Sequence, residues 1–208
     1  KRTGRDRVVR ASNVRAEDMP TDMPEAFRLA QALIQLAGSR IAGAKHPALV
    51  ADLSARTAEA LGADRMAVLR SRLSGWLHDI GKASVPDDIL EKPGPLDADE
   101  WEVVRRQHLF GERVVRDLPA LADAADAVRH LHERFDGTGY PDGLAGELIP
   151  LESRIVSVVS AYAAMTQERS YRSAMDTAAA VAELRACAGT QFDPRAVEAF
   201  VGILAEDA

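Results

Sequence analysis

The stretch LHDIGK (Leu77–Lys82) closes an apolar run of helical period and sets an imidazole beside a carboxylate. A neutral imidazole supplies one metal ligand, and a carboxylate can bridge two ions. Gly81 allows the chain to turn away sharply after the pair. A lone His-Asp pair is more often an ordinary helix end. The metal-binding interpretation therefore depends on a second motif in the same chain, DGTGYP (Asp136–Pro141).

The pattern outside these motifs predicts an all-α fold. Apolar residues recur at helical spacing, and no segment shows the strict alternation of a strand. The chain is 47% hydrophobic but only 5% aromatic, and a core of small aliphatic side chains suits closely packed helices. We expect a bundle of about seven to eight helices that carries a glycine-rich loop over residues 136–150.

Capping residues indicate where several helices begin. Asp64 precedes a helix that ends at His78 and Asp79, and Asp97 with Glu100 forms a capping-box pattern before a long helix. Asp193 followed by Pro194 marks the start of the last helix. Further helices are predicted over residues 22–45, 47–61, 119–135, 151–167 and 177–188, with a short helical turn at 86–90.

Charge divides the chain into a basic start and an acidic body. Residues 1–15 hold six basic residues and one acid, a net charge of +5, so the remainder carries −11 of the total of −6. We expect residues 1–21 to be a basic linker or arm of a longer chain, residues 22–45 an N-terminal helix, and residues 46–208 the main domain. That helix either packs on the domain or forms a homodimer with a second copy. An acidic body argues against general nucleic-acid binding.

Cysteine content and hydropathy bear on the compartment. Cys187 is the single cysteine, so no disulfide framework exists and a reducing compartment is favoured. No apolar run is long enough to cross a bilayer, and no secretory signal is visible. With a pI near 5.4, these features predict a cytoplasmic location.

The placement of the histidines favours a metal site. Taken singly, each histidine is more often a surface residue or a satisfied core residue than a ligand. A helical bundle that turns several of them inward, beside Asp79, can nevertheless bind metal between facing helices. Imidazoles with a bridging carboxylate suit Fe, Mn or Zn rather than Ca. The histidines are His46, His78, His108, His130 and His132.

On these motifs the chain resembles an HD-GYP domain, the group of HD metal-dependent phosphohydrolases that acts on cyclic di-GMP in bacteria. The resemblance covers roughly residues 46 to 201, in the order and spacing of that family. It implies the HD-domain helical bundle. The residues that carry it are 77–82, 85–87, 92–94, His108 with Gly111, 132–141, 164–166 and 192–194.

The resemblance also implies roles for individual residues. Asp79 and Lys82 would be catalytic, and Tyr140 would border the substrate pocket in a loop that also contacts other signalling domains. The implied cofactor is one or two divalent ions, Fe or Mn, and the implied ligand is cyclic di-GMP or a related dinucleotide. An upstream sensor domain is implied as well. The implied metal ligands are His46, His78, Asp79, His108 and His132, and the implied substrate-binding residues are Lys82, Tyr140, Arg169 and Arg172.

The chain departs from the family at several ligand positions. Leu131 stands where the family has a histidine, and Ser160 and Ala163 stand where it has aspartates. Ala42 replaces a glutamate that can support a third metal. His130 is a candidate substitute ligand, but a one-residue step on a helix turns a side chain by about 100°, so substitution requires a local bulge. Pro47 directly after His46 disfavours a continuous helix there.

These departures separate the functional hypotheses. Two close cations need anionic ligands, so we expect weakened, single or absent metal binding. The favoured interpretation is a weakly active or degenerate HD-GYP domain that serves cyclic di-GMP signalling as a nucleotide-binding, regulatory module. The alternative is an active phosphodiesterase with a dinuclear site. A third interpretation, a phosphohydrolase for another nucleotide, is disfavoured by the loop around Tyr140.

Overall fold

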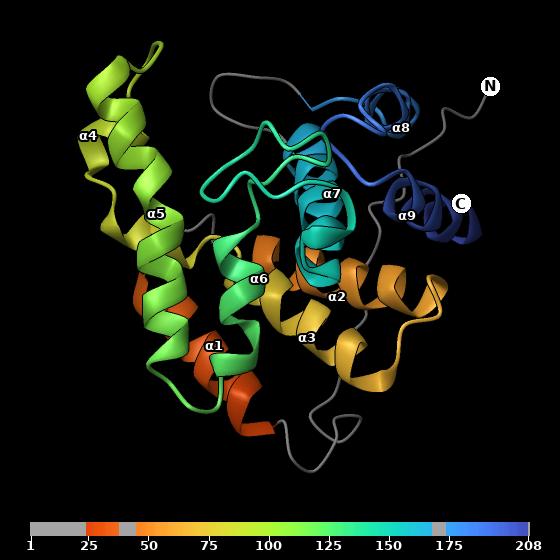
Figure 1. Cartoon of the computed structure of the whole chain (residues 1–208), viewed down its shortest axis with the longest axis horizontal. Coiled ribbons are helices and arrows are strands. Elements are labelled where there is room, and N and C mark those ends of the chain that lie inside the picture. The colour runs from red at the N-terminus through yellow and green to blue at the C-terminus, as the bar shows by residue number, and fades with distance from the viewer. Residues whose placement is uncertain (1–23, 38–44, 168–173, 208) are drawn as a thin grey trace, which may run out of the picture.

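The computed structural model describes residues 24–37, 45–167 and 174–207, and these residues form an all-α fold, as the sequence predicts (Figure 1). Within these ranges there are nine α-helices and no β-strand, and none of the described helices is both long and apolar enough to span a bilayer. The helices are α1 (Pro24–Ala37), α2 (Lys45–Ala60), α3 (Arg65–Leu77), α4 (Asp87–Leu90), α5 (Ala98–Arg116), α6 (Ala125–Arg129), α7 (Leu151–Thr166), α8 (Thr177–Ala186) and α9 (Pro194–Glu206).

The capping predictions are confirmed. The Asp64 carboxylate accepts a hydrogen bond from the Ala67 N–H at 2.8 Å at the start of α3. Asp97 and Glu100 form a complete capping box before α5, with each side chain accepting from the other's backbone N–H. The Asp193 side chain caps α9, and Pro194 occupies its first turn. Short polar side chains thus satisfy N–H groups that have no partner within their own helix.

The prediction of one helix over residues 119–135 is wrong. The chain there forms a 3₁₀ turn at Ala122–Ala124 and the five-residue helix α6, and regular structure ends at Arg129. Residues 130–135 run on as turns and irregular chain into the glycine-rich loop. No glycine or proline marks this break, which is instead stabilised by contacts with distant segments described below.

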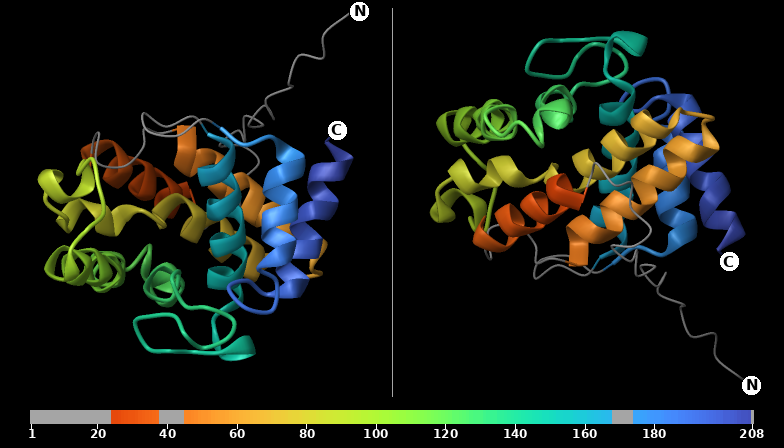
Figure 2. Two further views of the ribbon diagram at one scale, coloured as in Figure 1. Left: turned by 90° about the horizontal axis from the view of Figure 1, so that it is seen from above. Right: turned by 90° about the horizontal axis from the view of Figure 1, so that it is seen from below.

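Two hydrophobic clusters form the core. One joins α2, α7, α8 and α9 around Ile155 and Phe200, and Figure 2 shows α7, α8 and α9 side by side. The other joins α1, α3, α5 and α6 around Leu73 and Leu77. Helices α2 and α3 approach closely at Gly75, where a Cβ atom would lie only 2.6 Å from the Ala51 Cα.

Helix α1 packs on the body of the domain. Ala26, Ala30 and Ile34 recur at helical spacing on its inner face and belong to the second cluster, and Phe27 is buried as well. Of the two arrangements that the sequence allows for this helix, the structure therefore contains packing on the domain. The homodimer through the same helix stays a prediction.

Gly81 has a steric role that the sequence does not reveal. The 3₁₀ turn at Ile80–Ser84 packs directly on α5, and a Cβ atom on Gly81 would collide with the backbone carbonyl of Gln107. The absence of a side chain therefore lets α5 approach the His78-Asp79 pair. That approach brings His108, the residue after Gln107, toward the same region.

Candidate metal centre

His46, His78 and Asp79 converge from two helices. His46 lies in the first turn of α2, where Pro47 is tolerated, and His78 and Asp79 follow the last turn of α3. The two imidazole centroids lie 5.2 Å apart, and the Asp79 carboxylate is 3.4 Å from His78 Nε2. One ligand atom from each of the three residues lies within 4.8 Å of the others.

Hydrogen bonds orient both imidazoles of this cluster. His46 Nδ1 lies 3.0 Å from the Gln167 side-chain oxygen, and His78 Nδ1 lies 2.8 Å from the Gly75 carbonyl oxygen. Because both partners only accept, each Nδ1 carries the proton and donates it. Each Nε2 atom therefore keeps a free lone pair, as in metal sites whose ligands are held from behind. This donor set fits a divalent transition-metal ion.

Lys82 contacts the carboxylate of the cluster. Its Nζ atom lies 2.7 Å from Asp79 Oδ2, and its side chain, about one-third exposed to solvent, lines the cavity described below. Burial alone would raise the pKa of Asp79. Electrostatic interactions with His78 and Lys82, together with the hydrogen bond that the Lys82 ammonium donates to Asp79, outweigh that effect and hold the pKa of Asp79 well below its usual range. Asp79 is therefore an anion at neutral pH.

His108 and His132 form a second, neighbouring pair. Their ring centroids lie 4.1 Å apart, and the Tyr140 ring stacks on His132 at 5.4 Å with an interplanar angle of 12°. Burial lowers the pKa of His108 to about 3 and that of His132 to about 4. Burial likewise lowers the pKa of His46 to about 4. All three imidazoles are thus neutral at pH 7, which is the form that binds metal.

The His46, His78 and Asp79 group and the His108 and His132 pair differ in how closely their potential metal-ligand atoms approach one another. In the part of the chain that the structure describes, neither His108 nor His132 joins a group of three potential ligands within 4.8 Å. Asp79 acts electrostatically on both histidines and raises their pKa values, against the stronger effect of burial. His46, His78 and Asp79 therefore form a compact three-ligand group, flanked by a pair of imidazoles. The described residues hold a second group of three potential ligands within 4.8 Å, formed by His130, Glu133 and Asp142.

A cavity of about 380 Å³, the size of a small-molecule site, is lined by the three-ligand group and by His132. The predicted ligand His108 is not among its lining residues, whereas its neighbour Gln107 is. Ser157 and Ser160 of α7 line the cavity, and the Ser160 hydroxyl donates to the Ser157 carbonyl at 3.2 Å. Leu131 lines it too, whereas Ala163 is wholly buried in the core. The positions at which the family has a histidine and an aspartate thus face this cavity with a methyl-ended and a hydroxyl side chain. The remaining lining residues are His46, His78, Asp79, Lys82, Gln107, His132, Glu133, Arg134, Tyr140, Ala161, Ala164, Gln191 and Phe192.

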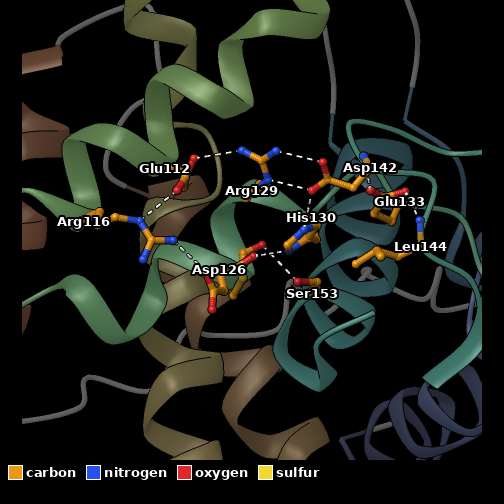
Figure 3. Close-up of polar contacts among 10 residues, drawn as sticks. Glu112, Arg116, Asp126, Arg129, His130, Glu133, Asp142, Leu144 and Ser153 are labelled. Atoms are coloured by element: carbon orange, nitrogen blue, oxygen red, sulfur yellow. Dashed lines mark hydrogen bonds and ion pairs between the residues drawn. The ribbon is translucent and has the colours of Figure 1, made fainter. Parts of the chain in front are cut away.

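His130 is bound elsewhere. Its Nδ1 atom lies 2.7 Å from the Asp126 carbonyl oxygen, and its Nε2 atom lies 2.8 Å from the Asp142 carboxylate (Figure 3). His130 is not among the residues that line the cavity. The helix that could have carried a local bulge here ends at Arg129, so the structure contains no such bulge.

A buried glutamate anchors the glycine-rich loop. The two Glu133 carboxylate oxygens accept hydrogen bonds from the N–H groups of Asp142 at 2.7 Å and Leu144 at 3.1 Å (Figure 3). Arg129 donates to the Asp142 carboxylate through Nε and Nη2, and its Nη1 atom donates to Glu112 on α5. These contacts hold Tyr140 beside the histidine pair. Sequence reasoning placed Glu133 in the motif without finding this role, and it missed Arg129 and Asp142.

Two predicted sets of residues fall outside the described part of the chain. The substrate-binding candidates Arg169 and Arg172 lie within residues 168–173, and Ala42 lies within residues 38–44. Their predicted roles stay predictions. Of the other predicted substrate-binding residues, Lys82 and Tyr140 both line the cavity.

Sequence comparison links the chain to a family. The model of the HD domain family matches residues 19–196. The chain is 41% identical over 177 residues to the cyclic di-GMP phosphodiesterase response regulator RpfG of Xanthomonas campestris, covering 84% of this chain and 46% of that protein. It is 36% identical over 159 residues to a cyclic di-GMP phosphodiesterase of Thermotoga maritima, covering 76% and 43%. It thus spans about half the length of these relatives, or slightly less.

Other matches extend the range of relatives and show the fold. The 3'3'-cGAMP-specific phosphodiesterase 3 of Vibrio cholerae is 38% identical over 147 residues, which cover 71% of this chain and 31% of that protein. The crystal structure of the V. cholerae cyclic GMP-AMP phosphodiesterase V-cGAP3 superposes with a TM-score of 0.66 at 18% identity, covering 85% of this chain and 49% of that one. The HD-GYP-type protein Bd1817 of Bdellovibrio bacteriovorus superposes at 0.65 with 16% identity, covering 88% and 64%. At such low identities the superpositions establish the fold alone.

Proposed function

Because the chain belongs to the HD domain family, and to its HD-GYP group, we propose that it binds a cyclic dinucleotide of the cyclic di-GMP class at a divalent-metal site and hydrolyses it weakly or not at all. The observation that carries the proposal is the His46, His78 and Asp79 group. Its donors converge within 4.8 Å, and both imidazoles are held with Nε2 free. These residues would hold one ion, Fe or Mn.

The charges in the cavity support a single ion. Among the described lining residues the carboxylates are Asp79 and Glu133, and both oxygens of Glu133 already accept from backbone N–H groups of the loop. Ser160 and Leu131 add no negative charge. Two adjacent divalent cations repel each other strongly unless anionic ligands offset their charge. Only Asp79 is available for this purpose, so we expect about one ion per chain.

The same residues suit a phosphodiester. A bound divalent ion would polarise a phosphoryl oxygen and lower the pKa of a bound water molecule. Lys82, positioned by Asp79, places an ammonium at the cavity where it can neutralise a phosphate oxygen. Because His108 and His132 are neutral, the positive charge of the cavity would come from the ion and from cationic side chains such as Lys82. The proposed binding of phosphates by Arg169 and Arg172 rests on the family resemblance.

Metal content and nucleotide binding test the proposal together. Protein purified anaerobically and supplied with Fe(II) or Mn(II) should retain about one ion by elemental analysis and bind cyclic di-GMP in calorimetry. His78→Ala should lose the ion. The matched control is His130→Gln, because His130 is bound to Asp126 and Asp142 outside the cavity lining. If His130→Gln lost the ion as well, His130 would be a ligand and the proposed set would be wrong.

The second candidate is an efficient phosphodiesterase. It is favoured by the curated relatives, whose names describe cyclic di-GMP phosphodiesterases. Turnover measured with protein in excess over cyclic di-GMP separates the two. Rapid hydrolysis that disappears in His78→Ala would establish the second candidate. Little or no hydrolysis by the wild-type chain, together with a gain of activity in the double variant Leu131→His and Ser160→Asp, would support the first proposal, in which lost metal ligands weaken catalysis.

A further inference from the structure

Arg105 contacts a residue of the cavity, although it is not itself among the residues that line the cavity. Its guanidinium carbon is 5.7 Å from the centroid of Tyr140, the aromatic residue of the glycine-rich loop that lines the cavity. Tyr140 in turn stacks on His132. The His132 imidazole, the Tyr140 ring and the Arg105 guanidinium thus form a continuous series of contacts.

Helix geometry explains why Arg105 reaches this position. Residues three apart on an α-helix lie on neighbouring parts of one face. Arg105 precedes the buried His108 by three residues on α5, so its long side chain extends from the same side of the helix as His108. The glycine-rich loop extends from the start of α7 toward α5 (Figure 1). Tyr140 and Arg105 meet where the loop approaches the helix.

Within the described residues, the Arg105 guanidinium also lacks an acidic partner. Across residues 24–37, 45–167 and 174–207, no carboxylate lies within ion-pair distance of it, and its side chain is exposed. Its neighbour Arg106 pairs with Glu102 at 2.8 Å, and Arg116 pairs with Glu112 and Asp126. In a chain of net charge −6, an arginine that stacks on a cavity tyrosine and stays unpaired is available for an anionic ligand.

We infer that Arg105, oriented by the Tyr140 ring, binds the second phosphodiester of the cyclic dinucleotide, the one that is not at the metal. This inference rests on the proposed function. A cyclic dinucleotide carries two phosphodiesters, and the His46, His78, Asp79 and Lys82 group can take only one of them. The planar guanidinium matches two phosphate oxygens, and stacking on Tyr140 limits its conformational freedom before the ligand arrives. Arg105 would therefore favour dinucleotides over mononucleotides.

The test compares cyclic di-GMP with GMP by calorimetry in the presence of Mn(II). Arg105→Gln should weaken cyclic di-GMP binding about tenfold or more, because a charge-assisted hydrogen bond is lost. GMP binding should change little, since its single phosphate would occupy the metal side. Arg105→Lys should restore much of the dinucleotide affinity by restoring the charge. The matched control Arg106→Gln removes the adjacent guanidinium, which pairs with Glu102, and should leave both affinities unchanged.

The outcomes separate this inference from the proposed function. If the wild-type chain binds cyclic di-GMP and Arg105→Gln binds it equally well, the subsite is wrong and the proposed function stands. Equal weakening of GMP, or a lower melting temperature of Arg105→Gln, would assign Arg105 to loop structure instead. Failure of Arg105→Lys to restore any affinity would contradict recognition by charge. If the wild-type chain binds no cyclic di-GMP at all, the proposed function fails and this inference fails with it.

Discussion

His46 Nδ1 and the Gln167 side-chain oxygen lie 3.0 Å apart, although 121 residues separate them in the chain. Gln167 follows the last turn of α7, and His46 lies in the first turn of α2. The bond fixes which ring nitrogen of His46 is protonated and directs the other one toward Asp79. A residue that never touches the metal would thus set the affinity of the site.

Gln167→Leu should lower the affinity for Mn(II) by about tenfold to a hundredfold, the usual effect of losing a group that orients a metal ligand. Competition with a metal-binding dye measures it. Gln31→Ala, on the exposed side of α1, is the control and should have no effect. Unchanged affinity in Gln167→Leu would mean that His46 is oriented by other contacts or is not a ligand.

The stability of the metal-free protein should fall with falling pH. Burial lowers the pKa of His46 to about 4, of His108 to about 3 and of His132 to about 4, against about 6.5 in the unfolded chain. Between pH 6.5 and pH 4 the unfolded state binds more protons, so the free energy of unfolding decreases as the pH is lowered. The slope should approach ~1.4 kcal/mol per pH unit for each histidine involved.

Urea unfolding in EDTA at several pH values between 7.5 and 4.5 measures this slope. His108→Leu should make the slope shallower, because one of the buried imidazoles is removed. A free energy of unfolding that stays constant from pH 7 to pH 5 would show that the histidines are protonated in the folded state without cost.

Removal of the Glu133 carboxylate should loosen the glycine-rich loop. Glu133→Ala leaves the N–H groups of Asp142 and Leu144 without their acceptor, at a cost of about 1–3 kcal/mol for a buried polar group. Hydrogen exchange at residues 136–146 should accelerate, and cyclic di-GMP affinity should fall because Tyr140 is no longer held. Glu147→Ala, on the exposed end of the same loop, should change neither quantity.

Addition of a single methyl group at Gly81 should disturb both fold and site. Gly81→Ala directs a Cβ atom into the Gln107 carbonyl and forces α5 away, with a loss of about 1–3 kcal/mol typical of overpacking. Metal retention should also fall, because the 3₁₀ turn that carries Gly81 directly follows His78 and Asp79. Gly94→Ala is the control, since a Cβ atom there meets nothing within 4 Å. Equal stability of the two variants would show that α5 can shift freely.

Local signals explain what the sequence predicted well. Asp64, Asp97 and Asp193 cap helices through bonds to N–H groups two or three residues away, and such bonds follow from short patterns. The chain near His130 is different, because its helix ends without a glycine or proline. Bonds from His130 to Asp142 and from Glu133 to the loop replace helical bonds there, and no periodicity reveals them.

The residues of the candidate site also divide into those that local sequence patterns predict and those that only the folded structure reveals. The sequence predicts His78, Asp79, His108 and His132 as metal ligands because their motifs are contiguous or regularly spaced, and these roles stay predictions. Gln167, by contrast, acts through a contact across 121 residues, and Arg105 acts through a meeting of helix and loop. Such partners depend on how the helices pack, which a pattern of apolar residues constrains only loosely.

The Glu133 anchor also determines how freely the glycine-rich loop can diverge. Its carboxylate contacts main-chain N–H groups, which nearly every amino acid possesses, so the contact at Leu144 places no demand on the side chain. Proline is the exception, because it has no N–H to donate. The loop surface can therefore acquire new side chains, and with them new binding specificities, while Tyr140 keeps its place beside the histidines.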